Sequence, residues 1–130
     1  MKYYFNTILN TKDFDAAIEQ VTEELKKEGF GILTDIDVAA TFKKKLDVDF
    51  KKYRILGACN PQFAHKAISS EDKIGVFLPC NVVVEAHENG DIEVSAVDPI
   101  ASMSTVENET LGSLAMDVQA KMKKVVAGLT

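Results

Sequence analysis

The sequence has few cysteines, no long apolar run and no excess of basic residues, and each absence excludes a class of protein. Two cysteines in 130 residues are too few for a disulfide scaffold. No apolar segment approaches the roughly 18 residues that a membrane-spanning helix requires, and residues 1–6 do not resemble a signal peptide. The net charge of -5 argues against sequence-independent binding to DNA or RNA, which requires basic surface. We therefore expect a cytoplasmic protein with free thiols and with neither membrane nor nucleic-acid partners.

The chain also lacks internal repeats, low-complexity tracts and linkers, which predicts one domain over residues 1–130. Its length is typical of a single domain. Hydrophobic residues make up 46% of the chain and charged residues 27%, as in ordinary globular proteins. Such a chain can bury a hydrophobic core and fold alone.

Two long segments, residues 13–28 and 107–127, repeat apolar residues at three- and four-residue steps and are predicted to be amphipathic helices. Gly29 fits the left-handed position that follows the first helix. We expect both apolar faces to pack in the core, and a homodimer contact is the less favoured alternative. The apolar positions are Phe14, Ala17, Ile18, Val21 and Leu25 in the first helix, and Leu111, Leu114, Ala115, Val118, Met122 and Val125 in the second.

The segments between these helices carry strand and turn signals. A short helix is predicted over residues 38–46, with Asp35 or Asp37 as its N-cap. Asn60-Pro61 is predicted to start another helix, which runs to about Ser69. Asn89-Gly90 predicts a type I′ turn and hence a hairpin. The predicted fold is α+β, with helices on a single sheet, a β-hairpin in the C-terminal half and the order β-α-β-α-β-α-β-β-α. Predicted strands cover residues 2–9, 30–36, 53–59, the stretch 73–87 interrupted by Pro79, and 91–97.

Two Cys-Asn dipeptides are the strongest candidates for a functional site. Cys59 precedes the helix that Asn60-Pro61 starts, where unpaired N–H groups and the helix dipole favour a thiolate. Cys80-Asn81 follows Pro79 at an expected kink, where backbone groups can be free for a ligand. The alternative for both cysteines is inert packing in the core, which is common for free cysteine.

Histidines add little to these motifs. His65 and His87 are the only two, and their spacing from Cys59 and Cys80 matches no structural zinc pattern. We therefore expect no metal site, and the sequence identifies no cofactor. His65 could act as a base for Cys59, because it lies less than two helical turns beyond the start of the helix that follows Cys59. Otherwise both histidines are expected at the surface.

Several short motifs are spread along the chain: Gly29-Phe30-Gly31, Asp35-Ile36-Asp37, Tyr53 to Pro61 with Ala64, Leu78 to Val82, and Asp98-Pro99. Together they resemble domain-of-unknown-function family 302 over nearly the whole chain. The resemblance implies an α+β fold, a homodimer and no established activity, and some relatives occur with sulfur-transfer and sulfur-oxidation proteins. It implies a shared motif at Cys59, Asn60, Pro61, Pro79, Cys80 and Asn81.

Three hypotheses for the function follow. In the first, the two motifs form a pocket that binds a small molecule or a sulfur species. In the second, the protein is a thiol-dependent enzyme or sulfur carrier that uses Cys59, with Cys80 as resolving thiol and His65 as base. In the third, the cysteines are structural and the protein acts without catalysis, by dimerising or by binding another protein.

Overall fold

A computed structural model describes residues 2–130. The chain forms five strands, five α-helices and a short 3₁₀ helix within that range. The strands are β1 (Tyr4–Ile8), β2 (Gly31–Asp37), β3 (Tyr53–Cys59), β4 (Cys80–Ala86) and β5 (Ile92–Val97). The helices are α1 (Phe14–Lys27), α2 (Val38–Leu46), α3 (Pro61–Ser70), the 3₁₀ helix η1 (Ile74–Phe77), α4 (Pro99–Met103) and α5 (Glu109–Gly128).

The strands form one antiparallel sheet in the order β1-β5-β4-β3-β2. Strands β2 to β5 follow one another as a meander, and β1 is added beside β5. The connection from β1 through α1 to β2 therefore leads from one edge of the sheet to the other. This order brings the N-terminal strand against residues late in the sequence, with Tyr4 paired to Val97.

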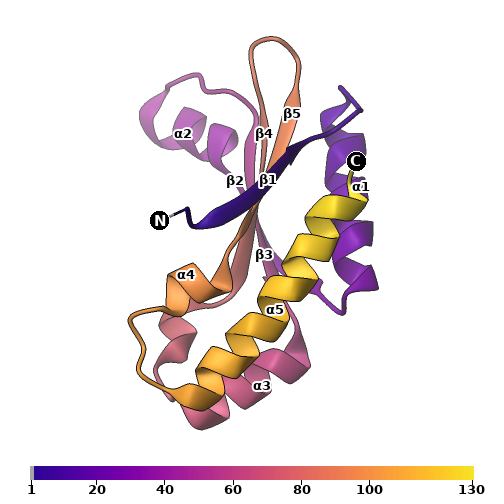
Figure 1. The fold of residues 1–130 in the computed structure, drawn as a ribbon. Helices are drawn as coiled ribbons and strands as arrows, with labels where there is room; N and C mark the ends of the chain where they lie inside the picture. Colours follow the sequence, from indigo (N-terminus) through magenta and orange to yellow (C-terminus); the bar gives the residue numbers. More distant parts are fainter. Residues whose placement is uncertain (1) are drawn as a thin grey trace.

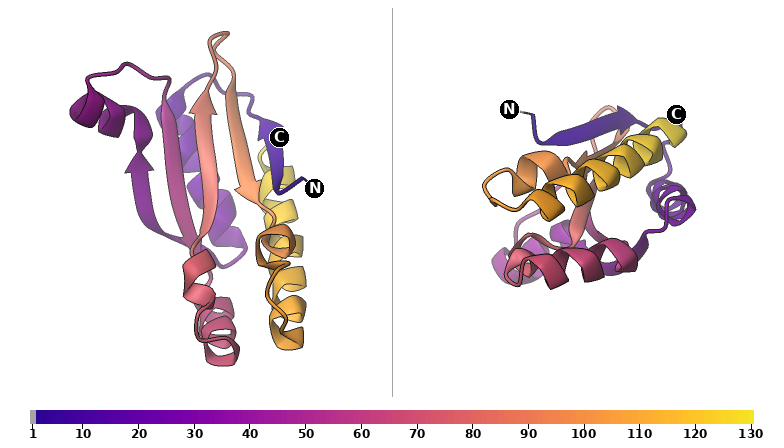
Figure 2. Two further views of the ribbon diagram at one scale, coloured as in Figure 1. Left: turned by 90° about the vertical axis from the view of Figure 1, so that its left-hand side faces the viewer. Right: turned by 60° about the horizontal axis from the view of Figure 1, so that its bottom comes forward.

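The helices cover the sheet unequally. Figure 1 shows α1 and α5 on one side of the sheet and α2 on the other, while α3 lies beyond one end of the strands, beside α5. Figure 2 shows the strands from the side away from α1 and α5, where much of their length is uncovered. Alternate residues of β4 and β5 are buried beneath α1 and α5. The hydrophobic core lies between this side of the sheet and the two helices. Its largest fully buried side chains include Val21, Leu25, Leu56, Val84, Ile92, Val94, Val118 and Met122.

Local sequence signals place most of these elements correctly. Asp13 caps α1, accepting a hydrogen bond from the N–H of Ala16 at 3.1 Å, and Gly29 has a φ of 84° after that helix. Asp37, rather than Asp35, caps α2. The predictions of α+β class, a single sheet and a C-terminal-half hairpin are confirmed.

The predicted type I′ turn at Asn89-Gly90 is wrong, although the hairpin forms. A type I′ turn needs a positive φ at both central residues, whereas Gly90 has a φ of 91° and Asn89 is not among the described residues with positive φ. The N–H of Gly90 bonds to the carbonyl of His87 at 2.9 Å, and the N–H of His87 bonds to the carbonyl of Asp91 at 2.8 Å. This is the pattern of a three-residue loop that ends in a left-handed glycine.

Two short elements, η1 and α4, are absent from the predicted order. Each is too short to show a helical repeat, since η1 has four residues and α4 has five. The segment before Pro79 is thus partly helical, and β4 begins directly after that proline. The last helix starts at Glu109, capped by Asn108. Within the described part of the chain, no helix is both long and apolar enough to cross a membrane.

Candidate functional site

The side of the sheet that faces away from α1 and α5, called the open face below, is the candidate site. Strand alternation directs every second residue to this face. Cross-strand pairing places Tyr53 beside Glu85, Glu85 beside Glu93, and Val83 beside Ser95. The open face includes Tyr4, Asn6, Ile8, Thr34, Ile36, Tyr53, Ile55, Gly57, Cys59, Asn81, Val83, Glu85, Glu93, Ser95 and Val97.

A hollow of about 390 Å³ lies on the open face. All three tyrosines of the chain line it, and the rings of Tyr3 and Tyr4 pack edge to face with centroids 5.1 Å apart. We call this hollow the tyrosine pocket, and its lining combines aromatic rings, aliphatic side chains and a few polar groups. The lining residues are Tyr3, Tyr4, Tyr53, Asn81, Val83, Glu85, Glu93, Ser95 and Val97.

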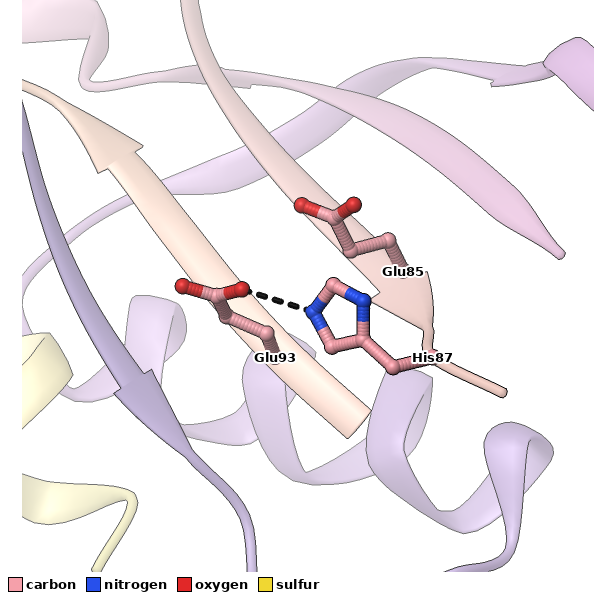
Figure 3. Close-up of side chains that lie close together, drawn as sticks. All are labelled: Glu85, His87 and Glu93. Carbon is pink, nitrogen blue, oxygen red and sulfur yellow. Dashed lines mark hydrogen bonds and ion pairs between the residues drawn. The ribbon is translucent and has the colours of Figure 1, made fainter. Parts of the chain in front are cut away.

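Glu85, His87 and Glu93 form the polar cluster at this face, as Figure 3 shows. His87 Nε2 lies 2.8 Å from Oε1 of Glu93. Asn6 Nδ2 donates to Oε2 of Glu93 at 2.6 Å. The pKa of Glu93 lies below its ordinary value, first because of the hydrogen bond from Asn6 and then because of the bond from His87. The Glu93 carboxylate is therefore held in its charged form by two neighbours.

Glu85 has a different neighbour. Lys51 Nζ lies 2.7 Å from Oε1 of Glu85, and this hydrogen bond raises the pKa of Lys51. The Lys51 side chain is 39% exposed, whereas that of Glu85 is 16% exposed. The Glu85 side chain is thus the more buried partner of the pair, and the Lys51 side chain remains in contact with water.

The first Cys-Asn motif lies where β3 ends and α3 begins. Cys59 is half-buried and is the last residue of β3. Asn60 caps α3 by accepting a hydrogen bond from the N–H of Phe63 at 3.3 Å, and Pro61 is the first residue of the helix. The candidate base His65 is exposed on α3. Asn60 and Pro61 therefore have a defined structural role at the helix start.

The second motif divides between core and surface. Cys80 is buried with 5% exposure, and its pKa is raised to about 11, mainly by burial and secondarily by the nearby Cys59. Asn81 is exposed and is the one residue of the two motifs that lines the tyrosine pocket. Pro79 precedes β4, and its peptide bond to Leu78 is cis.

The sheet brings the two motifs to the same end of neighbouring strands. Cys80 pairs with Ala58, the residue before Cys59, and Asn81 pairs with Gly57. Both cysteines are free thiols. Because successive residues of a strand point to opposite faces, Cys80 shares the core face with Ala58 while Cys59 is directed to the other side. The motifs are adjacent in the fold, but alternation directs their thiols to different faces.

The family assignment follows from the sequence match. A model of the family described as domain of unknown function DUF302 matches residues 5–129. The chain belongs to this family. Among solved structures, the crystal structure of uncharacterized conserved protein DUF302 from Bacillus stearothermophilus is similar over 100% of both chains, with a TM-score of 0.90 and 27% sequence identity. Comparison with curated proteins gives no match.

Membership of the DUF302 family confirms the resemblance drawn from the Cys-Asn motifs, and the fold is shared with the Bacillus protein. Sequence reasoning missed the tyrosine pocket and the position of Glu85 and Glu93 in its lining. A signal for the glutamates was available, since Glu85 and His87 alternate along a predicted strand and Glu93 follows the hairpin turn. The convergence of Tyr3 and Tyr4 with Tyr53 had no local signal.

Proposed function

We propose that this DUF302 protein binds a small molecule in the tyrosine pocket. The observation that carries the proposal is the convergence of all three tyrosines with Glu85 and Glu93 on one hollow of about 390 Å³. Ligand pockets commonly measure about 300 to 1,000 Å³ and combine aromatic walls with a few polar groups. The described lining has this composition.

The chemistry of the lining indicates the kind of ligand. Tyrosine rings, with Val83 and Val97, offer flat apolar contacts to an aromatic or aliphatic body. Glu85 and Glu93 supply negative charge and hydrogen-bond acceptors to a polar end group. Of the residues in the two Cys-Asn motifs, Asn81 lines this pocket, whereas Asn60 and Pro61 start α3.

Tyrosine fluorescence gives a direct test, because the chain contains no tryptophan and every tyrosine lines the pocket. Benzylamine, with an aromatic ring and a cationic end, serves as the probe, and benzoate serves as the anionic counterpart. In metal-free protein we expect a saturable fluorescence change with benzylamine that Glu93→Gln weakens and the exposed control Phe77→Ala leaves unchanged. Absence of saturation, or an equal response to benzoate, would reject the proposed site.

A second candidate function is thiol chemistry at Cys59, either as an enzyme nucleophile or as a sulfur carrier. It is supported by the half-burial of Cys59 directly before the α3 cap. Alkylation of each thiol in the native protein, followed by peptide mass spectrometry over a range of pH, provides the test. Fast modification of Cys59 together with slow modification of buried Cys80 supports this function. Equally slow modification of both contradicts it.

A third candidate function is non-catalytic interaction through a homodimer that covers the open face. Its support is the group of exposed apolar side chains there, which includes Ile8 and the 48% exposed Ile36. Sedimentation velocity of Ile36→Asp would then show a weakened dimer. Met116→Asp is the control, since Met116 is an exposed residue of α5 on the covered side. A wild-type protein that sediments as a monomer at all concentrations excludes this candidate.

A further inference from the structure

We infer that Glu85, His87 and Glu93 form a binding site for a divalent transition-metal ion, for which Zn²⁺ is the test ion. These three side chains each offer a ligand atom, and the three atoms lie within 4.8 Å of one another. Figure 3 shows the two carboxylates and the imidazole ring on the same side of the β4–β5 hairpin.

The distances allow the three groups to share one ion. Three atoms no more than 4.8 Å apart all lie within about 2.8 Å of a common point, compared with about 2.0 to 2.2 Å for zinc bonds to nitrogen and oxygen. Shifts below about 1 Å, within the range of small side-chain rotations, would complete the contacts. The backbone supports this geometry, because Glu85 pairs with Glu93 and the hydrogen bond from His87 to Asp91 closes the ladder.

The donor set selects the class of ion. One imidazole nitrogen and two carboxylates suit zinc, manganese or iron, whereas calcium takes six to eight oxygen ligands. Two carboxylates also balance the charge of a divalent ion. Three protein ligands leave a coordination position open, as in zinc sites that bind a water or a substrate. Since Glu85 and Glu93 line the tyrosine pocket, this position would be accessible from the pocket.

The neighbouring side chains have opposite effects on metal binding. Asn6 holds Oε2 of Glu93, which leaves Oε1 on the side of His87 for the ion and resembles the outer hydrogen bonds that orient metal ligands. Lys51 occupies Oε1 of Glu85 and must be displaced or share the carboxylate. Its partial exposure allows water to solvate the released ammonium group. Lys51 is therefore a competitor of the metal, whereas Asn6 is a positioning residue.

This site shares two residues with the tyrosine pocket but does not depend on an organic ligand, so the metal alone tests it. Isothermal titration of chelator-treated protein with Zn²⁺ should give one saturable site per chain. His87→Gln and Glu93→Gln should each weaken binding by about tenfold or more, since each removes one of three ligands. The matched controls His65→Gln and Glu88→Gln should bind zinc as the wild type does. Circular dichroism verifies the fold of each variant.

Two further measurements distinguish this site from metal binding by the thiols and from loss of folding in the variants. Lys51→Met should bind zinc more tightly than the wild type, an effect that a damaged fold does not produce. The Co²⁺ complex should lack the near-ultraviolet charge-transfer band of thiolate ligands, which excludes binding by Cys59 or Cys80. No saturable zinc binding, unchanged affinity in His87→Gln, or a cobalt–thiolate band would each overturn the inference. None of these results depends on whether benzylamine binds the tyrosine pocket.

Discussion

Replacing Gly57 with alanine should destabilise the protein, because the second Cys-Asn motif packs directly against this glycine. Gly57 is buried in the middle of the sheet and pairs with Asn81. A Cβ at this position would overlap Oγ1 of Thr34 and would lie 2.7 Å from Cγ of Pro79. Ordinary contacts of a Cβ begin at 3.4 Å, so the proline ring or the strand must move.

The magnitude follows from two opposing terms. Overpacking of this kind costs about 1 to 3 kcal/mol. Alanine also loses less backbone entropy than glycine on folding, which returns about 0.5 to 1 kcal/mol. The two ranges leave a net loss of up to about 2.5 kcal/mol in the free energy of unfolding, with a middle value slightly above 1 kcal/mol. With a slope near 2 kcal/mol per molar urea, that middle value lowers the unfolding midpoint by roughly 0.6 M.

Urea unfolding followed by circular dichroism measures this loss, and Gly31→Ala is the matched control. Gly31 also lies in a strand, but nothing lies within 4 Å of the Cβ position. Gly31→Ala should therefore be neutral or stabilising by about 0.4 to 1 kcal/mol. Adding Thr34→Ala to Gly57→Ala should restore only part of the stability, because the rigid ring of Pro79 remains. If Gly57→Ala is as stable as Gly31→Ala, the proposed contact with Pro79 is wrong.

Three further predictions concern single side chains. Asn60→Ala should lower stability by about 0.5 to 2 kcal/mol through loss of the α3 cap, whereas Asn81→Ala should change stability by less than about 0.5 kcal/mol and weaken benzylamine binding. Asp35 receives a hydrogen bond from Nε of Arg54 at 2.7 Å, and the pair lowers the Asp35 pKa. Its stabilisation is present above the ordinary aspartate pKa and lost as the pH falls through the lowered value. At neutral pH, Asp35→Asn should cost only about 0.2 to 1 kcal/mol, because both side chains are partly exposed. Burial raises the pKa of Cys80 to about 11 in the folded protein. The free energy of unfolding should therefore fall as the pH rises from the ordinary thiol pKa to about 11, by about 2 to 3 kcal/mol in total.

These predictions have internal controls. Urea unfolding at neutral and acidic pH should show the difference between wild type and Asp35→Asn shrinking toward zero in acid, and a constant difference would contradict the assigned ion pair. Over the alkaline range, Cys80→Ala should lose less stability than the wild type, because it lacks the buried thiol. Equal losses would mean that other groups account for the alkaline change. For the asparagines, equal destabilisation by both substitutions would contradict their different roles.

Much of the secondary structure could be predicted from local sequence signals. The strand over residues 53–59 and the helix start at Asn60-Pro61 agree with the structure, because strand propensity, an asparagine cap and a first-turn proline act within a few residues. The short helices η1 and α4 could not be predicted from periodicity. The turn at Asn89-Gly90 shows that a dipeptide signal can identify a hairpin while the closing hydrogen bonds select a longer loop.

The sequence by itself determined the α+β class, most element boundaries and the two Cys-Asn motifs, since these depend on residue type and spacing along the chain. Only the tertiary structure decided the candidate site. Asn6 and Glu93 are 87 positions apart and meet because β1 is added beside β5. Alternation along a strand indicates which residues share a face, but it does not say which face the helices cover. That choice depends on where α1 and α5 bury their apolar surfaces, and it leaves the tyrosines, Glu85 and Glu93 together on the opposite side.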